Sequence, residues 1–310
     1  MIQNEPSNKD LPFLAALFAI FLCALFGSNA VAIKLTFKGL GVFTTAGIRF
    51  SIAALVIFLW ARSTGQPLAL KKSQFHQIII LSLIFWIQLS LFYFGLNKSN
   101  ASRGTLLSNL VPFFILFLAH VFIPGDRITR KKIFGILLGF AGVFFMFTET
   151  KGITADFRIG ELIILAATLF WACNAVYLKK IISAYNAFQI VFYTTVFSAP
   201  LFFLEAFLWD APMIARLDIR ILGALLYQSL ITASFAFVAW NTMLQKYGTV
   251  AMHSFVFIMP ISGVALGGLV LGEPITPKIT MALAMIVAGI LVVHWKPGKP
   301  APAYPIRRGF

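Results

Sequence analysis

Ten stretches of the sequence are apolar over about 20 residues each, and this limits the possible folds more than any other feature. A helix needs about 20 such residues to cross the roughly 30 Å hydrocarbon core of a bilayer. The stretches are continuous and lack the alternating polarity of barrel strands, so each is expected to be a helix. They fall at 11–33, 42–61, 77–96, 104–123, 132–148, 160–178, 187–209, 219–241, 249–271 and 277–295.

The composition agrees with a protein that lies in a lipid bilayer. Hydrophobic residues make up 60% of the chain and charged residues 11%, whereas a soluble domain carries about 25% charged residues. The first stretch follows only one basic residue, Lys9, and has no small-residue cleavage site, so a retained helix is expected and not a signal peptide. The prediction is an all-α integral membrane protein with ten transmembrane helices.

The net charge of +15 is spread over the connections between apolar stretches. It does not form one patch, which argues against a nucleic-acid partner. Lys and Arg are denser in the connections on the N-terminal side, for example at Arg127, Arg130 and Lys131. By the positive-inside rule, both termini are expected to be cytoplasmic. The compact size and short loops are typical of a protein of the bacterial inner membrane.

A short motif occurs twice. Phe26–Lys34 reads FGSNAVAIK, and Trp171–Lys179 reads WACNAVYLK. Other features repeat at nearly the same offset. Pro112 corresponds to Pro260, and GDRIT at 125–129 corresponds to GEPIT at 272–276.

The sequence therefore predicts two copies of a five-helix unit, at 1–150 and 157–296, followed by a disordered basic tail at 297–310. With five helices in each copy, the second enters the membrane from the opposite side, so the repeats are inverted. Such repeats are common in secondary transporters, where the substrate site lies near the repeat interface.

These motifs resemble the EamA family of the drug/metabolite transporter superfamily over residues 12–296. The resemblance implies a ten-helix exporter of small metabolites, often amino acids or related compounds. It also implies a central cavity lined by the first, third, fourth, sixth, eighth and ninth helices. It does not fix the substrate, and a nucleotide sugar is the alternative, which would require several cations around its phosphates.

The repeated asparagines, Asn29 and Asn174, have two interpretations. Their amides could bind substrate in the cavity, or they could link neighbouring helices at about 0.6 to 2 kcal/mol each. Their symmetric positions fit both interpretations equally well.

Aromatic and amide side chains form a second group of candidate substrate-binding residues. Trp171 and Tyr177 lie three residues on either side of Asn174, near one face of a helix. Gln88 and Gln228 are polar points on the third and eighth stretches. Thr232 is a further polar point, and the aromatic residues on these two stretches could complete an aromatic wall: Trp86, Phe92, Tyr93, Phe235 and Trp240. For most single aromatic residues, packing or lipid contact is the stronger interpretation.

Two titratable side chains stand out in the apolar stretches. Arg49 is a charge in the body of the second stretch, and charges at this depth line cavities or pair with another group. The alternatives are contacts with backbone carbonyls or a position nearer the interface. His253 could exchange a proton near neutral pH, although a hydrogen-bonded histidine near the interface is favoured.

Pro112 and Pro260 are expected to break the fourth and ninth helices and to free the carbonyls of Ser108 and Val256. Matched kinks favour a mechanical role. Small residues form stripes on the fifth and tenth stretches, which predict close helix contacts within the chain or in a homodimer. Their members are Gly135, Gly139, Gly142, Ala284, Ala288 and Gly289.

Catalytic, metal and cofactor sites are not expected. The four histidines are scattered, the acidic residues are placed in connections, and Cys23 and Cys173 lie in apolar stretches as packing residues. Without a carboxylate at membrane depth, proton coupling is not favoured, and facilitated export of neutral or zwitterionic solutes is the leading hypothesis. A lipid-modifying enzyme and a non-transporting sensor are the competing classes.

Overall fold

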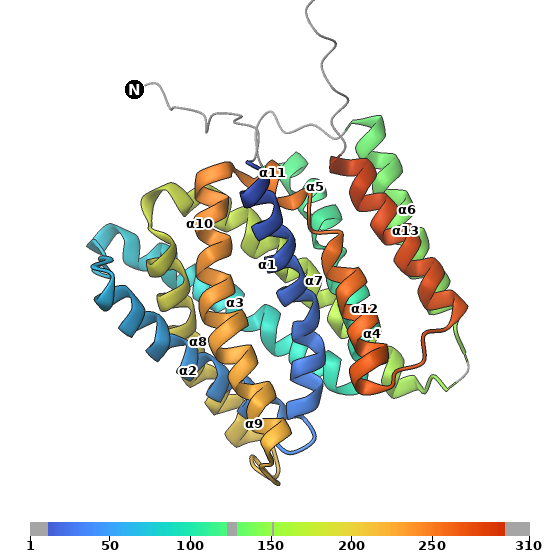
Figure 1. Cartoon of the computed structure of the whole chain (residues 1–310), viewed down its shortest axis with the longest axis horizontal. Helices are drawn as coiled ribbons and strands as arrows, with labels where there is room; N and C mark the ends of the chain where they lie inside the picture. Colours follow the sequence, from blue (N-terminus) through green and yellow to red (C-terminus); the bar gives the residue numbers. More distant parts are fainter. Residues whose placement is uncertain (1–11, 123–128, 151, 295–310) are drawn as a thin grey trace, which may run out of the picture.

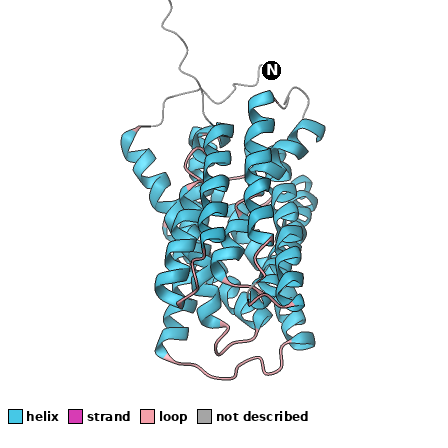
Figure 2. Cartoon of the chain, turned by 90° about the vertical axis from the view of Figure 1, so that its right-hand side faces the viewer, coloured by secondary structure: helices cyan, strands magenta, loops and turns pink. Residues whose placement is uncertain are grey.

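Helices account for nearly all of the chain that the structure describes. The computed structural model covers residues 12–122, 129–150 and 152–294. Over these ranges it consists of helices and their connections, with one isolated bridge between Leu40 and Ile214 (Figure 2). The elements are α1 (Phe13–Thr36), α2 (Val42–Ser63), α3 (Lys72–Lys98), α4 (Ala101–Ser108), α5 (Val111–Phe122), α6 (Arg130–Phe147), α7 (Ala155–Ile181), the 3-10 helix η1 (Ile182–Ala184), α8 (Ala187–Trp209), α9 (Ile219–Leu226), the π-helix η2 (Tyr227–Ala236), α10 (Phe237–Tyr247), α11 (Thr249–His253), α12 (Ile258–Leu271) and α13 (Pro277–His294).

Nine helical spans within the described ranges are long and apolar enough to cross a membrane, by length and composition. The remaining predicted span, 132–148, corresponds to α6, which has 18 residues. Its first turn contains Arg130, Lys131 and Lys132, and these three charged residues make it less apolar than a membrane span of its length is required to be. The all-helical membrane fold is confirmed, and the tenth crossing stays a prediction.

The helices pack in pairs that join the two predicted halves of the chain. α1 lies beside α12, α2 beside α8, α3 beside α7, and α6 beside α13. Figure 1 shows α1 near the centre of the bundle, with α6 and α13 together at one side. α1 begins and α13 ends at the same end of the bundle (Figure 1).

Both predicted proline breaks coincide with interruptions of the helix. α4 ends at Ser108 and α5 begins at Val111, directly before Pro112. α11 ends at His253 and α12 begins at Ile258, two residues before Pro260. The expectation that the Val256 carbonyl is free is wrong, because it accepts a hydrogen bond from the Met259 N–H at 3.0 Å. A tightened turn replaces the bond that the proline cannot make.

The small-residue stripes meet each other inside the chain, between α6 and α13. A Cβ atom added at Gly135 would lie 2.8 Å from the carbonyl oxygen of Gly289, and one at Gly142 would lie 2.9 Å from that of Ala282. The two backbones are therefore nearly in contact, which requires small residues. Ala284 of the α13 stripe is exposed, and the homodimer stays a prediction.

The expectation that all acidic residues lie in connections is wrong for Glu161 and Glu205, which are buried in α7 and α8. Glu161 lies in α7 with no exposed surface, and it pairs with Arg103 of α4, whose side chain is 1% exposed. Arg158 contacts the other carboxylate oxygen at 2.8 Å. The burial is tolerated because two guanidinium groups compensate one carboxylate.

Helix ends near this ion pair are held by charged side chains from other elements. Glu273 accepts hydrogen bonds from the N–H groups of Ala101 and Ser102 at 2.6 and 2.8 Å, at the start of α4. Lys34 donates to the Leu96 and Ser99 carbonyls at 3.1 and 2.8 Å, at the end of α3. Both contacts have the sign that the helix dipole favours.

Candidate functional site

A buried arginine lies at the centre of a polar network. The Arg49 side chain is 1% exposed. Its Nη1 donates to the Tyr93 hydroxyl at 2.8 Å, and its Nη2 donates to Thr232 Oγ1 at 3.1 Å. Its Nε is buried and has no hydrogen-bond partner in the described part of the chain. Among the residues described, no carboxylate lies within 4.0 Å of the guanidinium.

The network extends to α1 through two side chains of η2. The Thr232 hydroxyl lies 3.0 Å from Asn29 Oδ1, within donating distance. The Tyr93 hydroxyl donates to Gln228 Oε1 at 3.3 Å, and Gln228 Nε2 donates to Thr36 Oγ1 at 3.3 Å. The network thus connects α1, α2 and α3 with η2, and so joins the two predicted halves.

The π-helix η2 brings these side chains to the network. It has 10 residues, and the Ser234 hydroxyl bonds the carbonyl five residues earlier, at Ser229, at 2.7 Å. The wider turn shifts the phase of the side chains relative to an α-helix, and π-turns occur frequently at functional sites. Gln228 and Thr232 are both fully buried in η2.

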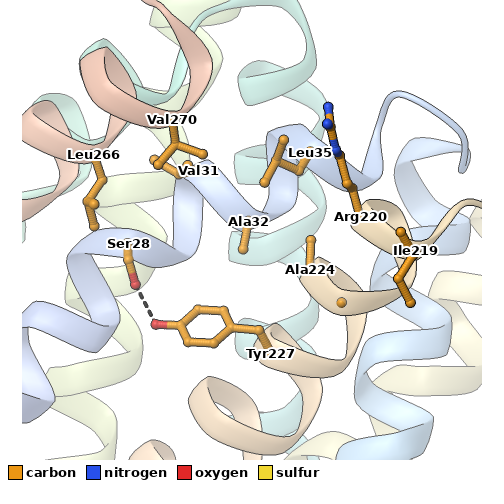
Figure 3. A pocket seen from close by; sticks show the side chains of 11 residues that line it. Ser28, Val31, Ala32, Leu35, Ile219, Arg220, Ala224, Tyr227, Leu266 and Val270 are labelled. Atoms are coloured by element: carbon orange, nitrogen blue, oxygen red, sulfur yellow. Dashed lines mark hydrogen bonds between the residues drawn. The ribbon is translucent and has the colours of Figure 1, made fainter.

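An apolar cavity of about 360 Å³ lies between α1, α9 and α12. It is open along one side, where Ile219 is 81% and Val270 51% exposed. Val31 and Leu35 of α1 and Leu266 and Val270 of α12 contribute apolar walls. Figure 3 shows Ser28 and Tyr227 meeting at one end of the cavity, where their hydroxyl oxygens are 2.5 Å apart. Ser28 and Tyr227 directly precede the network residues Asn29 and Gln228 in the sequence.

Charged side chains surround the other end of the cavity. A second, more polar pocket of about 460 Å³ shares Leu35, Arg220 and Val270 with the first. Lys38, Arg216 and Arg220 line it together with Asp218. The N–H groups of Ile221 and Arg220 and the nearby arginines hold the pKa of Asp218 below its usual range, so this carboxylate is ionised at neutral pH. We call this region the cationic mouth, because three cations face one carboxylate.

The structure brings only some of the predicted site residues together. Asn29, Gln228 and Arg49 share the network with Tyr93 and Thr232. The cavity is lined by the first, eighth and ninth predicted helices, which is half of the set that the family resemblance implied. Sequence reasoning missed Ser28, Thr36 and Tyr227. Ser28 could have been found, since it lies inside the repeated motif.

The group around Asn174 lies elsewhere, between α7 and α3. Asn174 Nδ2 donates to the Leu81 carbonyl at 3.3 Å. Trp171 packs edge-on against Phe92, with ring centroids 6.0 Å apart. Tyr177 packs against a separate apolar cluster that includes Ile78 and Leu81. These contacts are of the helix-linking type.

Gln88 and His253 also take no part in the hydrogen bonds described above for the Arg49 network. Gln88 is 2% exposed, and its Oε1 has no hydrogen-bond partner within the described residues. His253 lies in α11, near the end of the bundle where α1 begins (Figure 1). Its ring is 5.9 Å from that of Trp240 and 6.3 Å from that of His294.

Within the part of the chain that is described, no group of three His, Cys, Asp or Glu side chains could hold a metal ion. Cys23 is buried in α1, and Cys173 is partly buried in α7. The polar groups at the site are amides, hydroxyls and one guanidinium. Such groups bind and orient a solute.

The sequence matches the model of the EamA-like transporter family twice, over residues 13–148 and 158–295. It is 23% identical to the uncharacterized transporter YoaV of Bacillus subtilis, covering 88% of this chain and 94% of that one. It is 24% identical to a probable amino-acid metabolite efflux pump of Escherichia coli, covering 92% and 95%.

A solved structure, titled only as the crystal structure of a protein, has the same fold. Its TM-score is 0.68 at 19% sequence identity, and the match covers 90% of this chain and 96% of that one. The matched family and the named relatives are transporters and not enzymes. The chain therefore belongs to the EamA-like transporter family and is an integral membrane protein.

Proposed function

We propose that the protein exports amino acids or related small metabolites by alternating access between two inverted five-helix repeats. The observation that carries the proposal is the polar network around Arg49. It joins α1, α2 and α3 to η2, and it adjoins an apolar cavity that ends at Ser28 and Tyr227. A polar site between two halves, next to a cavity, is the arrangement that alternating access requires.

The relatives support the substrate class. Two of them, from Escherichia coli and Salmonella typhimurium, are named probable amino-acid metabolite efflux pumps. The match to each covers 92% of this chain and 95% of the relative. A phosphorylated substrate is the weaker candidate, because Arg49 is the only charged side chain among the network residues named above.

The helix pairs support inverted repeats. If each helix is replaced by its equivalent in the other half, the contact of α1 with α12 becomes the contact of α7 with α4 and α5, which is also present. The same replacement turns the contact of α3 with α7 into the contact of α1 with α9 and η2. The pairs α2–α8 and α6–α13 each consist of two equivalent helices, so they stay the same. The two ranges matched by the family also support two copies. The shared end of α1 and α13 favours an even number of crossings, with α6 as the tenth.

We propose that export is facilitated diffusion, driven by the solute's concentration gradient and not by a proton gradient. The buried carboxylate of Glu161 is compensated by Arg103 and Arg158, and Glu205 accepts a hydrogen bond from Ser90 at 2.7 Å. Glu161 is therefore not free to carry a proton, and Glu205 lies near the end of α8, outside the Arg49 network. We place both termini in the cytoplasm on the basis of the charge distribution, in a bacterial inner membrane.

Flux in liposomes tests this proposal. The purified protein would be reconstituted and screened against a pool of neutral amino acids, with and without an imposed pH gradient. We expect flux of at least one amino acid without the gradient, and little acceleration by it. Strong acceleration would contradict facilitated transport, and absence of flux from a folded protein would contradict the substrate class.

The repeat offers a matched pair of variants for this assay. Asn29→Ala removes an amide from the network and should reduce flux about ten-fold or more, since it disturbs the Thr232 contact with Arg49. Asn174→Ala removes the equivalent amide from the α7–α3 contact and should keep most of the flux while lowering thermal stability. Equal loss in both variants would contradict the assignment of the site to the Arg49 network.

A further inference from the structure

We propose that Arg49 is the receptor for a carboxylate group of the transported solute, so that the substrate class is an apolar carboxylate or an amino acid with an apolar side chain. This inference rests on the proposed transport function and adds the head-group chemistry. The site is the guanidinium of Arg49 together with the hydroxyls of Tyr93 and Thr232.

Two buried arginines show that an internal carboxylate is missing at Arg49. Arg103 and Arg49 are both 1% exposed. Arg103 is paired with Glu161, whereas Arg49 donates to two neutral hydroxyls. The Nε of Arg49 has no hydrogen-bond partner in the described part of the chain. Burying an uncompensated charge costs several kcal/mol. A site that keeps such a charge is suited to an anion that arrives and leaves.

The geometry around Arg49 suits a carboxylate. A guanidinium has five N–H donors in one plane and can bind both oxygens of a carboxylate. Hydroxyl groups rotate, so those of Tyr93 and Thr232, now 2.8 and 3.1 Å from the guanidinium, can donate to the same anion when it binds. The Phe50 ring, with its centroid 4.9 Å from the Arg49 Cζ, holds the plane of the guanidinium.

The side of the Arg49 network away from the termini, where an exported solute would leave in the proposed orientation, favours an anion with an apolar body. The cationic mouth of Lys38, Arg216 and Arg220 attracts anions and repels cations. The cavity behind it has apolar walls and ends at the contact between Ser28 and Tyr227. Ser28 and Tyr227 belong to the same two elements as Asn29 and Gln228, so a movement of α1 relative to η2 that separates them would also change the contacts of the Arg49 network.

A binding comparison tests the head-group requirement. Hexanoate and hexanamide have the same apolar chain and differ in the charge of the head group. Their binding to the purified full chain would be measured by the shift in its thermal unfolding midpoint. We expect hexanoate to bind about ten-fold more tightly or better, because a hydrogen-bonded ion pair replaces a neutral contact. Equal binding of the two probes would overturn the proposal.

Substitutions in the Arg49 network test whether the preference for hexanoate over hexanamide arises at Arg49. Arg49→Gln should abolish the preference for hexanoate. Thr232→Asp places a carboxylate beside Arg49 Nη2, and it should raise the unfolding midpoint without ligand and abolish the preference. The control Thr232→Asn matches the aspartate in size but supplies no charge, so it should weaken the preference for hexanoate much less than Thr232→Asp does. Retention of the preference in Thr232→Asp would contradict the proposal even if Arg49→Gln fails to fold.

These outcomes separate the receptor from the transport function. Binding of the probes requires no flux, so a carboxylate preference in a chain that moves no amino acid would reject transport and keep the receptor. Amino-acid flux that survives in Arg49→Gln would reject the receptor and keep transport.

Discussion

Arg49 and Arg103 are equally buried, but they serve different purposes. Arg103 is bonded to Glu161 and to the Met146 carbonyl, the latter at 2.9 Å, and so ties α4 to α7 and α6. The guanidinium of Arg49 donates to two neutral hydroxyls, those of Tyr93 and Thr232. Residue type and burial are the same at both positions. The partner of each arginine therefore decides whether it is structural or available to a solute.

Removing one partner of the Arg103 pair should destabilise the protein severely. In Glu161→Gln, Arg103 stays buried without a counter-charge, and the expected loss is about 3–5 kcal/mol. The measurement is thermal or denaturant unfolding of the purified protein in detergent. The double variant Arg103→Leu/Glu161→Leu should lose much less, because it buries no unpaired charge. A double variant as unstable as Glu161→Gln would contradict this account of the ion pair.

Sequence reasoning identified Arg49, Asn29 and Gln228 as candidates but could not bring them together. Their contacts depend on the phase of η2 and on how α1, α2 and α3 surround it. Asn29 and Asn174 are equivalent in sequence, yet only Asn29 reaches the network. Each asparagine contacts the equivalent helix of the other half, so the difference lies in the groups that these helices supply, the Thr232 hydroxyl on η2 and the Leu81 carbonyl on α3. A repeat in the sequence therefore predicts equivalent positions and leaves the contacts at each position undetermined.

At the level of helices, apolar length and proline positions were sufficient to predict most elements. The interruptions between α4 and α5 and between α11 and α12 lie next to Pro112 and Pro260, as the missing N–H requires. The π-helix η2 was not predicted, because the apolar stretch at 219–241 has no feature that distinguishes a wider turn. The burial of Glu161 was also not predicted, because its partner Arg103 is distant in sequence.

Close packing of α1 on α12 predicts a large effect of one methyl group. A Cβ atom at Gly27 would lie 2.4 Å from the Met259 carbonyl oxygen and 2.0 Å from Ser262 Oγ. Gly27→Ala should therefore cost about 1–3 kcal/mol of stability, because the two helices must move apart. Gly223→Ala is the control, since a Cβ atom there meets nothing within 4 Å. Thermal unfolding of the two variants checks the prediction, and a Gly27→Ala protein as stable as Gly223→Ala would contradict it.

Across the whole molecule, the bundle is held together by contacts between the two halves. Glu273 binds the start of α4, Arg103 binds Glu161, and Thr232 binds Arg49. These contacts differ in burial and charge. The contact between Ser28 and Tyr227 consists of two hydroxyl groups and contains no ion pair. We expect movement between the halves to open this contact and to retain the buried Arg103–Glu161 pair.

Counterflow in liposomes is the most direct test of a carrier that alternates between two states. Liposomes containing the protein would be loaded with an unlabelled amino acid that it transports, and uptake of the labelled compound would then be followed. We expect the internal load to accelerate uptake above the level in unloaded liposomes, because a loaded carrier returns to the other side with its solute. Thr232→Asp should show no acceleration, since its carboxylate occupies Arg49. Uptake that is indifferent to the internal load, or absent from a folded protein, would contradict the account.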